Sequence, residues 1–407
     1  FFLPPSLAPV LMSPAHLTKW TAVLLAALVL LQTAGITSAA LVSSHVFSNH
    51  KGGCGKTTLL FHTCAEYAMR HPDEKVMVID TTLRGDLSEL LLGGDKGVAG
   101  KTALRAVSHL RSTTKLLMQA AAVHAAEGMS SEGGSSSIKS IVAKMFAKEK
   151  GARGGSLLDL EDHLVKVQEF NKGIPENVYL CPGGSGPQTS FPQQQQADIV
   201  DTIRKCLEDG PGKWKVLCDT DGDQGFSDYT KIAHALCDNC IIPLKTNVND
   251  FSNRCIPMLE ELFQQRQQGQ ARSRVQLIVW NEIDVYKNTA SPVSGLITPP
   301  KAAQGVIGML NSLVAEVASN YPDLFYNRAP ADRAEMQDFG KATTMCMRLY
   351  GVTGMAAAEH GIPFCSMQPG TLSGGRISYE ISADMLTQLS NNVAELSDRL
   401  NDPPFGV

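Results

Sequence analysis

The sequence predicts an α/β domain, with a doubly wound and mostly parallel β-sheet flanked by helices. Two observations support this fold class. Short apolar runs alternate with helical stretches along most of the chain. A glycine-rich turn, KGGCGKTT (51–58), follows the first apolar run and precedes a helical stretch, which is where such sheets commonly bind phosphates. We therefore expect one domain over residues 40–400.

ALVSSHVFS (40–48) leads into the glycine-rich turn, and TTLLFHTCAEYAMRH (57–71) follows the turn as a helix. The other apolar runs predict strands at 75–80, 177–182, 213–219, 239–245, 274–281 and 362–366. Seven strands of this kind favour a single doubly wound domain.

Two stretches interrupt the alternation. Residues 97–175 include SSEGGSSSIKS, a composition typical of a flexible surface segment. Residues 285–345 carry ASPVSGLITPP, followed by a helix-like apolar run. We interpret both stretches as insertions on the surface of the domain, and QQQQ (193–196) as a loop or a helix start.

Composition limits the class of protein. The chain has 407 residues, of which 43% are hydrophobic and 19% charged, so it can bury a core of ordinary size. The net charge of −4 gives no global attraction to nucleic acid or anionic lipid. The ten cysteines are scattered and do not form a disulfide framework.

The N-terminal segment 1–39 is set apart by its hydrophobicity. Residues 20–42 are almost free of charge and follow Lys19, with Met12 as an alternative start. This pattern resembles a signal peptide and equally fits a short membrane anchor. Because the chain begins with Phe, an incorrect gene start is a third interpretation.

The glycine-rich turn has the composition of a phosphate-binding loop. Its backbone N–H groups and the following helix N-terminus can face phosphate oxygens. Lys56 can then reach the β- and γ-phosphates, and the Thr57 hydroxyl can bind Mg²⁺. The residues expected to contact the nucleotide here are Gly52, Gly53, Cys54, Gly55, Lys56, Thr57 and Thr58.

The usual GxxxxGK[ST] pattern has a glycine where this chain has His50, followed by Lys51. KGGCGKTT resembles the deviant Walker A loop, KGGxGKT[TS], of the ParA/MinD family of ATPases, which includes nitrogenase iron protein and the Mrp-type iron-sulfur carriers. The resemblance extends over residues 40–395. In this family the lysine that matches Lys51 reaches the partner subunit's nucleotide. The resemblance therefore implies ATP, Mg²⁺ and a homodimer formed through an ATP sandwich.

Further positions resemble the family pattern. Asp219, at the end of an apolar run, resembles the acid that holds Mg²⁺ through water, so Thr57 and Asp219 are the implied metal site. DTDGDQGFSD (219–228) takes the place of the family's switch segment. Asn281 matches an asparagine that reads the adenine edge, and Ile362 and Pro363 resemble a late element near the base.

One departure concerns the acids after the second strand. The family pattern is D-x-D, and in IDTTLRGD the first acid is Asp80, whereas Thr82 replaces the second. In the family that second carboxylate orients the attacking water, and positioned acid–base groups contribute about 10²- to 10⁴-fold. Because Thr cannot accept a proton at neutral pH, we expect slow hydrolysis unless Asp86 or Asp221 substitutes.

The resemblance implies an ATP-hydrolysing switch that positions or partitions cargo and responds to a protein activator. The implied catalytic residues are Lys51, Lys56 and Asp80. One alternative is a non-hydrolysing scaffold, in which Thr82 fixes the ATP-bound dimer. A weaker alternative is an iron-sulfur carrier using Cys237 and Cys240, although this pair precedes its strand and core packing explains it as well.

The sequence leaves DNA and a membrane surface open as partners. Lys341, Arg348 and Arg376 are available for DNA but are sparse. The C-terminal tail is amphipathic and acidic, which favours packing on its own domain over membrane binding. Because a nucleotide loop needs ATP, we expect a reducing intracellular compartment, the cytoplasm or an organelle interior, with membrane association through residues 20–42 if they are retained.

Overall fold

The computed structural model describes residues 40–94, 98–131, 158–184, 189–222, 225–284, 299–374 and 377–401. The described residues from Ala40 onward belong to one compact unit. Outside the described residues lie the N-terminal segment as far as residue 39, Arg376, and residues 132–157 and 285–298 of the two stretches expected to be insertions. Among the helices of the described ranges, none is both long enough and apolar enough to span a membrane.

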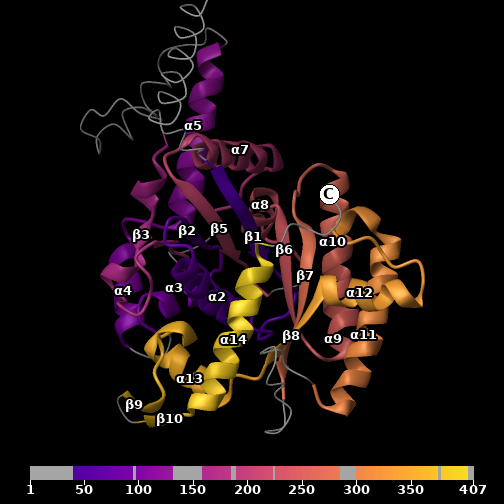
Figure 1. The fold of residues 1–407 in the computed structure, drawn as a ribbon. Coiled ribbons are helices and arrows are strands. Elements are labelled where there is room, and N and C mark those ends of the chain that lie inside the picture. Colours follow the sequence, from indigo (N-terminus) through magenta and orange to yellow (C-terminus); the bar gives the residue numbers. More distant parts are fainter. Residues whose placement is uncertain are drawn as a thin grey trace, which may run out of the picture. The chain divides into compact units, whose positions relative to one another are not determined.

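Eight strands form one sheet in the order β3-β4-β2-β5-β1-β6-β7-β8 (Figure 1). Within this sheet, β3 pairs antiparallel with β4 and the other described pairings are parallel, which confirms the predicted fold class. The strands are β1 (Ala40–Phe47), β2 (Lys75–Asp80), β3 (Val165–Lys166), β4 (Val178–Cys181), β5 (Lys213–Asp219), β6 (Asn239–Lys245), β7 (Arg274–Ile283) and β8 (Thr344–Arg348). Because β1 lies between β5 and β6, the loop that follows it lies at the carboxyl ends of the central strands, where ligands bind in such sheets.

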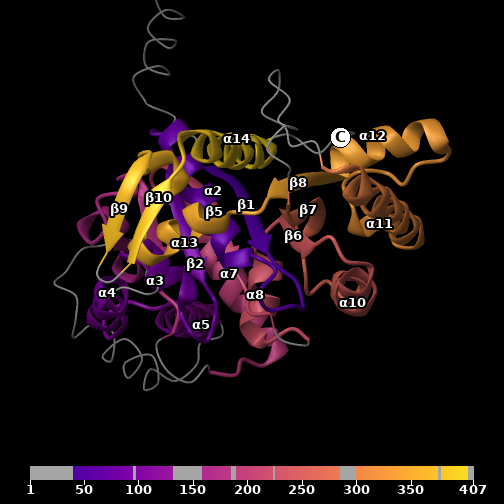
Figure 2. The ribbon, with the colours of Figure 1, turned by 90° about the horizontal axis from the view of Figure 1, so that it is seen from below.

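Helices cover both faces of the sheet (Figure 2). One core cluster contains α2 (Lys56–Arg70), α3 (Asp86–Leu91), α4 (Val98–Ser108), α13 (Gly351–His360) and α14 (Ala383–Arg399). The other contains α5 (Thr113–Ser131), α7 (Gln193–Asp209), α8 (Asp228–Leu236), α10 (Ile256–Gln267), α11 (Lys301–Asn320) and α12 (Arg333–Thr343). In β5, Leu217 packs into the first cluster, and Val216 and Cys218 pack into the second, as the alternation of side chains along a strand requires.

Short elements complete the chain. The 3-10 turns are η1 (Leu160–His163), η2 (Val167–Glu169), η4 (Pro322–Leu324) and η5 (Phe364–Ser366). Beyond β6 come α9 (Val248–Asp250) and a π-helical turn, η3 (Phe251–Cys255). A separate antiparallel hairpin joins β9 (Gly370–Gly374) to β10 (Ile377–Ile381).

One predicted strand is wrong. Residues 362–366 form no strand, because Phe364–Ser366 is a 3-10 turn and the Phe364 ring stacks on His62 of α2, with ring centroids 3.6 Å apart. Pro363 also lacks the N–H that a strand ladder needs. The last strand of the sheet order is instead β8, which begins at the end of the stretch 285–345 that we expected to be an insertion and continues beyond it.

The expected insertions also contribute to the core. Leu116 and Ala120 of α5, and Leu310 and Val314 of α11, are fully buried, so the helical parts of both stretches belong to the fold. The remaining expectations for helices are confirmed. Helix α7 begins at Gln193, in the glutamine run, and α14 packs its apolar side chains on its own domain.

Candidate phosphate-binding site

The glycines of the loop after β1 adopt conformations that other residues rarely adopt. Gly53 and Gly55 have φ angles of 71° and 96°. A Cβ atom at Gly55 would also lie 2.1 Å from Nδ2 of Asn281, so no side chain fits there. At Gly52 and Gly53 the space beside the backbone is open. The loop therefore has the tight, exposed backbone that close approach by a phosphate requires.

The Lys56 side chain is buried within this loop. Its Nζ donates to the carbonyl oxygens of Lys51 (3.1 Å) and Asn49 (3.3 Å). Asn49 is itself fixed, because its Nδ2 donates to Pro243 O of β6 at 2.8 Å. The ammonium group is thus held among loop carbonyls, at the first residue of α2.

Asp219 has an unsatisfied carboxylate oxygen. Its Oδ2 accepts from Thr57 Oγ1 at 2.7 Å, whereas the fully buried Oδ1 has no partner within the described part of the chain. Burial, together with the charge of Asp80, raises the pKa of Asp219 to about 8, against the opposing effects of the Thr57 hydrogen bond and Lys56. A hydroxyl beside an unpaired carboxylate oxygen is the kind of hard donor set that Mg²⁺ prefers. These residues therefore fit a bound Mg²⁺.

Asp80 pairs with Asp219 on the neighbouring strand, and both of its carboxylate oxygens accept hydrogen bonds from residues that follow it in the chain. Its Oδ1 accepts from the N–H (3.0 Å) and hydroxyl (2.6 Å) of Thr82. Its Oδ2 accepts from the N–H (2.9 Å) and hydroxyl (2.6 Å) of Ser88. Thr82 Oγ1 also accepts from Gly85 N at 3.1 Å. The two side chains at the D-x-D positions thus bond each other and shape the start of α3.

The two acids considered as substitutes for Thr82 lie in different settings. Asp86 is exposed at the first residue of α3. Asp221 is partly buried, and its Oδ2 accepts from Leu83 N at 3.2 Å. Asp221 therefore links the loop after β5 to the loop after β2.

Lys51 forms an ion pair within its own chain. Its ammonium group pairs with the carboxylate of Asp250 in α9, and the side chains are 29% and 16% exposed. Asp250 is not among the site residues predicted from the sequence. It follows β6 at the same edge of the sheet as the phosphate loop, so its position in a parallel fold was the available indication.

Asn281 lies beneath the loop, near the end of β7. Its Nδ2 donates to Cys54 O at 2.9 Å, and its buried Oδ1 has no partner among the described residues. Cys54 in turn donates through Sγ to Lys51 O at 3.2 Å. The Asn281 amide therefore supports the loop backbone and keeps one acceptor unused. Thr58 lies partly buried in the first turn of α2.

The cysteine pair considered for an iron-sulfur cluster is packed in the core. Cys237 and Cys240 are fully buried, and the Cys237 thiol contacts Cys218 Sγ at 3.5 Å. Within the described ranges, no group of three His, Cys, Asp or Glu side chains could hold a metal ion.

The cations considered for DNA binding are also placed. Arg348 is buried and its guanidinium donates to Gln388 of α14, so we correct its interpretation as a surface cation. Lys341 is exposed, with Nζ 3.8 Å from Asp338 Oδ1.

Comparisons with known proteins place the chain as follows. No protein-family profile and no curated sequence matches it. Among solved structures, it is similar to a Cyanothece McdA variant in complex with ATP, at 12% identity over 88% of this chain and 96% of that one, with a TM-score of 0.48. It is also similar to pNOB8 ParA bound to nonspecific DNA, at 14% identity over 88% of this chain and 97% of that one, with a TM-score of 0.43. A third similar structure is MinD from Pyrococcus horikoshii OT3 complexed with Mg-ADP, at 13% identity over 88% of this chain and 96% of that one, with a TM-score of 0.42.

Proposed function

We propose that this chain is an ATP-dependent dimeric switch of the ParA/MinD type, which hydrolyses ATP slowly and positions or partitions a cargo. One observation carries the proposal. A buried carboxylate with an unpartnered oxygen, Asp219, lies beside the Thr57 hydroxyl, at the end of the strand next to a glycine-rich loop. Such an arrangement is costly without a cation and has a clear use with one.

Each residue of the loop has a separate task in this proposal. The backbone N–H groups from Gly52 to Thr57 would bind the phosphates, at the N-terminal end of α2. Lys56 would exchange its two carbonyl acceptors for phosphate oxygens. Thr57 and Asp219 would hold Mg²⁺, which when bound neutralises charge on the transferred phosphoryl group. The unused Oδ1 of Asn281 suits a base amino group as donor.

The dimer is proposed from Lys51. Family resemblance assigns this lysine to the partner subunit's nucleotide, and its ammonium group here pairs with Asp250 of its own chain. We propose that Lys51 exchanges Asp250 for the partner's phosphates when two ATP-bound chains meet. The cargo, an activating protein and a DNA or membrane surface remain partners to be identified by binding assays.

A second candidate is the non-hydrolysing scaffold, and one observation favours it. Asp80 accepts four hydrogen bonds from Thr82 and Ser88, so both side chains of the D-x-D positions are occupied by their own loop. Neither side chain is free to take a proton from an attacking water. Very slow cleavage or none is then expected from the isolated protein.

Single-turnover ATP cleavage by the full chain separates these candidates, with bound and cleaved nucleotide followed in one sample and Lys56→Ala as background. Cleavage above background supports the switch, and tight binding without cleavage supports the scaffold. Thr82→Asp should raise the rate by about tenfold or more if the missing acid limits hydrolysis, whereas Thr82→Ser should not. If the wild-type chain binds no nucleotide, both candidates are wrong.

A further inference from the structure

We infer that Glu261 of α10 is a positioning residue that holds Phe226, in the described part 225–228 of the switch segment, in register with the phosphate loop. The inference rests on the proposed function for its catalytic consequence. Glu261 Oε1 accepts from the N–H of Phe226, near the end of the segment, at 3.1 Å. Its Oε2 lies 3.6 Å from Nε2 of His50, which directly precedes the loop residue Lys51. One carboxylate thus contacts both segments.

The Phe226 ring strengthens this connection. It packs edge-on against the His50 ring, with centroids 5.0 Å apart, and stacks on His234 of α8 at 4.6 Å. His234 is fixed through both ring nitrogens, by Ser48 Oγ at 3.0 Å and Ser273 Oγ at 2.7 Å. Phe226 is therefore held against the end of β1 by its ring as well as by its N–H.

The segment also touches the loop near its beginning. A Cβ atom at Gly222 would lie 2.6 Å from Gly52 N and 2.7 Å from the carbonyl carbon of Lys51, so the two backbones are in direct contact. Gly222 lies between Asp219, which would hold Mg²⁺, and Phe226, which Glu261 anchors. Gly222 and Phe226 therefore contact Gly52 and His50 respectively, so both described parts of the segment lie against this stretch of the chain.

His50 makes this arrangement specific to the chain. A glycine at this position, as in the usual phosphate loop, would offer no ring to Phe226 and no nitrogen near Glu261. Burial lowers the pKa of His50, so at neutral pH the ring is uncharged. Its contacts with Glu261 and Phe226 are therefore those of a neutral, packed ring, and they set the position of the segment mainly by shape.

The test compares Glu261→Ala, Glu261→Gln and Glu260→Ala in the full chain. Glu260 is the exposed neighbour on the same helix, so its removal matches the change in charge. We expect Glu261→Ala to increase amide hydrogen exchange over residues 225–232 without nucleotide, to change ATP affinity by less than about threefold, and to slow single-turnover cleavage by about tenfold. Glu261→Gln keeps an acceptor for the Phe226 N–H, so its amide exchange and its rate of cleavage should both lie close to those of the wild-type chain.

Three results would overturn the inference: unchanged exchange in Glu261→Ala, a Gln variant as defective as the Ala variant, or an equal defect in Glu260→Ala. If Glu261→Ala fails to fold, Phe226→Leu tests the same anchor, because it removes the ring contacts and keeps the N–H. The exchange experiment needs no ATP. A wild-type chain without ATP cleavage would therefore refute the proposed hydrolysis while the anchor is still tested.

Discussion

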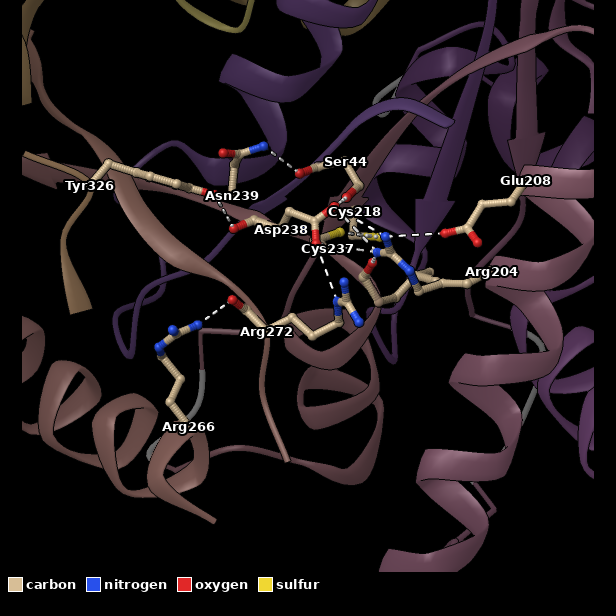
Figure 3. A network of polar contacts seen from close by, with 11 residues as sticks. Ser44, Arg204, Glu208, Cys218, Cys237, Asp238, Asn239, Arg266, Arg272 and Tyr326 are labelled. Atoms are coloured by element: carbon tan, nitrogen blue, oxygen red, sulfur yellow. Dashed lines mark hydrogen bonds and ion pairs between the residues drawn. The ribbon is translucent and has the colours of Figure 1, made fainter. Parts of the chain in front are cut away.

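Two carboxylates, one at the N-terminal end of a central strand and one at the C-terminal end of another, differ in how many hydrogen bonds they accept. Asp238, before β6, accepts from Ser44 Oγ at 3.0 Å, from Arg204 Nη1 at 3.3 Å and from Arg272 Nε at 3.2 Å (Figure 3). Asp219, at the end of β5, accepts from Thr57 only, and its second oxygen has no partner within the described ranges. The first carboxylate joins elements of the fold, whereas the second keeps an unpaired oxygen, which is the one proposed to face Mg²⁺.

The same contrast appears within β5. Lys215 is fully buried, and its Nζ donates to Ser43 Oγ (2.6 Å), Leu400 O (3.1 Å) and Asn401 Oδ1 (3.3 Å). Four residues later, Asp219 has its unpaired oxygen. Because an unpaired buried charge costs free energy that a paired one largely recovers, an unpaired group indicates a function and a paired group indicates structure.

The largest effect is expected from Asp219→Asn. Cleavage of ATP should fall on the order of 10²-fold or more, because the variant lacks the charge for Mg²⁺. The stability of the Mg²⁺-free protein should stay about unchanged at neutral pH, where the amide replaces a mostly protonated carboxyl group, and should rise above pH about 8, where it removes a buried charge. Single-turnover cleavage and thermal unfolding without Mg²⁺ measure both quantities.

Asp80→Asn is the matched control for this change. Its amide NH₂ would face the N–H of Ser88 or Thr82, so the variant should lose about 1–3 kcal/mol of stability. Equal stability losses in the two variants would contradict the comparison between satisfied and unsatisfied carboxylates.

The next effect concerns pH. The pKa of Asp219 is raised to about 8, so in the Mg²⁺-free protein the carboxyl group is mostly protonated at neutral pH. Its contribution to stability is greatest below pH about 4, the unfolded pKa, and declines as the pH rises towards 8. Binding of Mg²⁺ requires loss of the proton, so affinity for Mg-ADP should increase by up to about tenfold per pH unit below 8 and then level off.

Calorimetric titrations of Mg-ADP at pH 6.5, 7.5 and 8.5 measure this dependence, and a proton release that vanishes at the highest pH should accompany it. Asp219→Asn should show a flat profile between these values. An affinity that falls with rising pH in the wild-type chain would show that another group controls the binding.

The smallest effect is expected from the carboxylate that precedes β6, Asp238. Asp238→Ala leaves Arg204 and Arg272 without their shared partner and should cost about 1–2 kcal/mol, discounted because the Asp238 side chain is partly exposed. Affinity for Mg-ADP should not change. Urea unfolding with and without Mg-ADP tests this, and Glu208→Ala, which removes an exposed partner of Arg204, serves as the control. A large loss of nucleotide binding would show that Asp238 is not purely structural.

Much of the fold could be predicted from local patterns. Continuous apolar runs predicted strands such as β2, β5 and β6 with their observed bounds. Residues 362–366 look equally apolar, yet Phe364 packs on His62 of α2 and forms no ladder. In contrast, β8 reads TMCMR, in which only three consecutive residues are apolar, and its pairing with β7 identifies it as a strand.

The candidate site divides in the same way. Glycine spacing and the position of Lys56, Thr57 and Asp219 are properties of short segments, so the sequence by itself determined that a glycine-rich loop after β1 meets an acid at the end of β5. Whether a given charge is paired depends on residues far along the chain, as with Lys51 and Asp250, or Glu261 and His50. Only the tertiary structure decided which carboxylates are satisfied, because pairing requires contact in space, which no local pattern specifies.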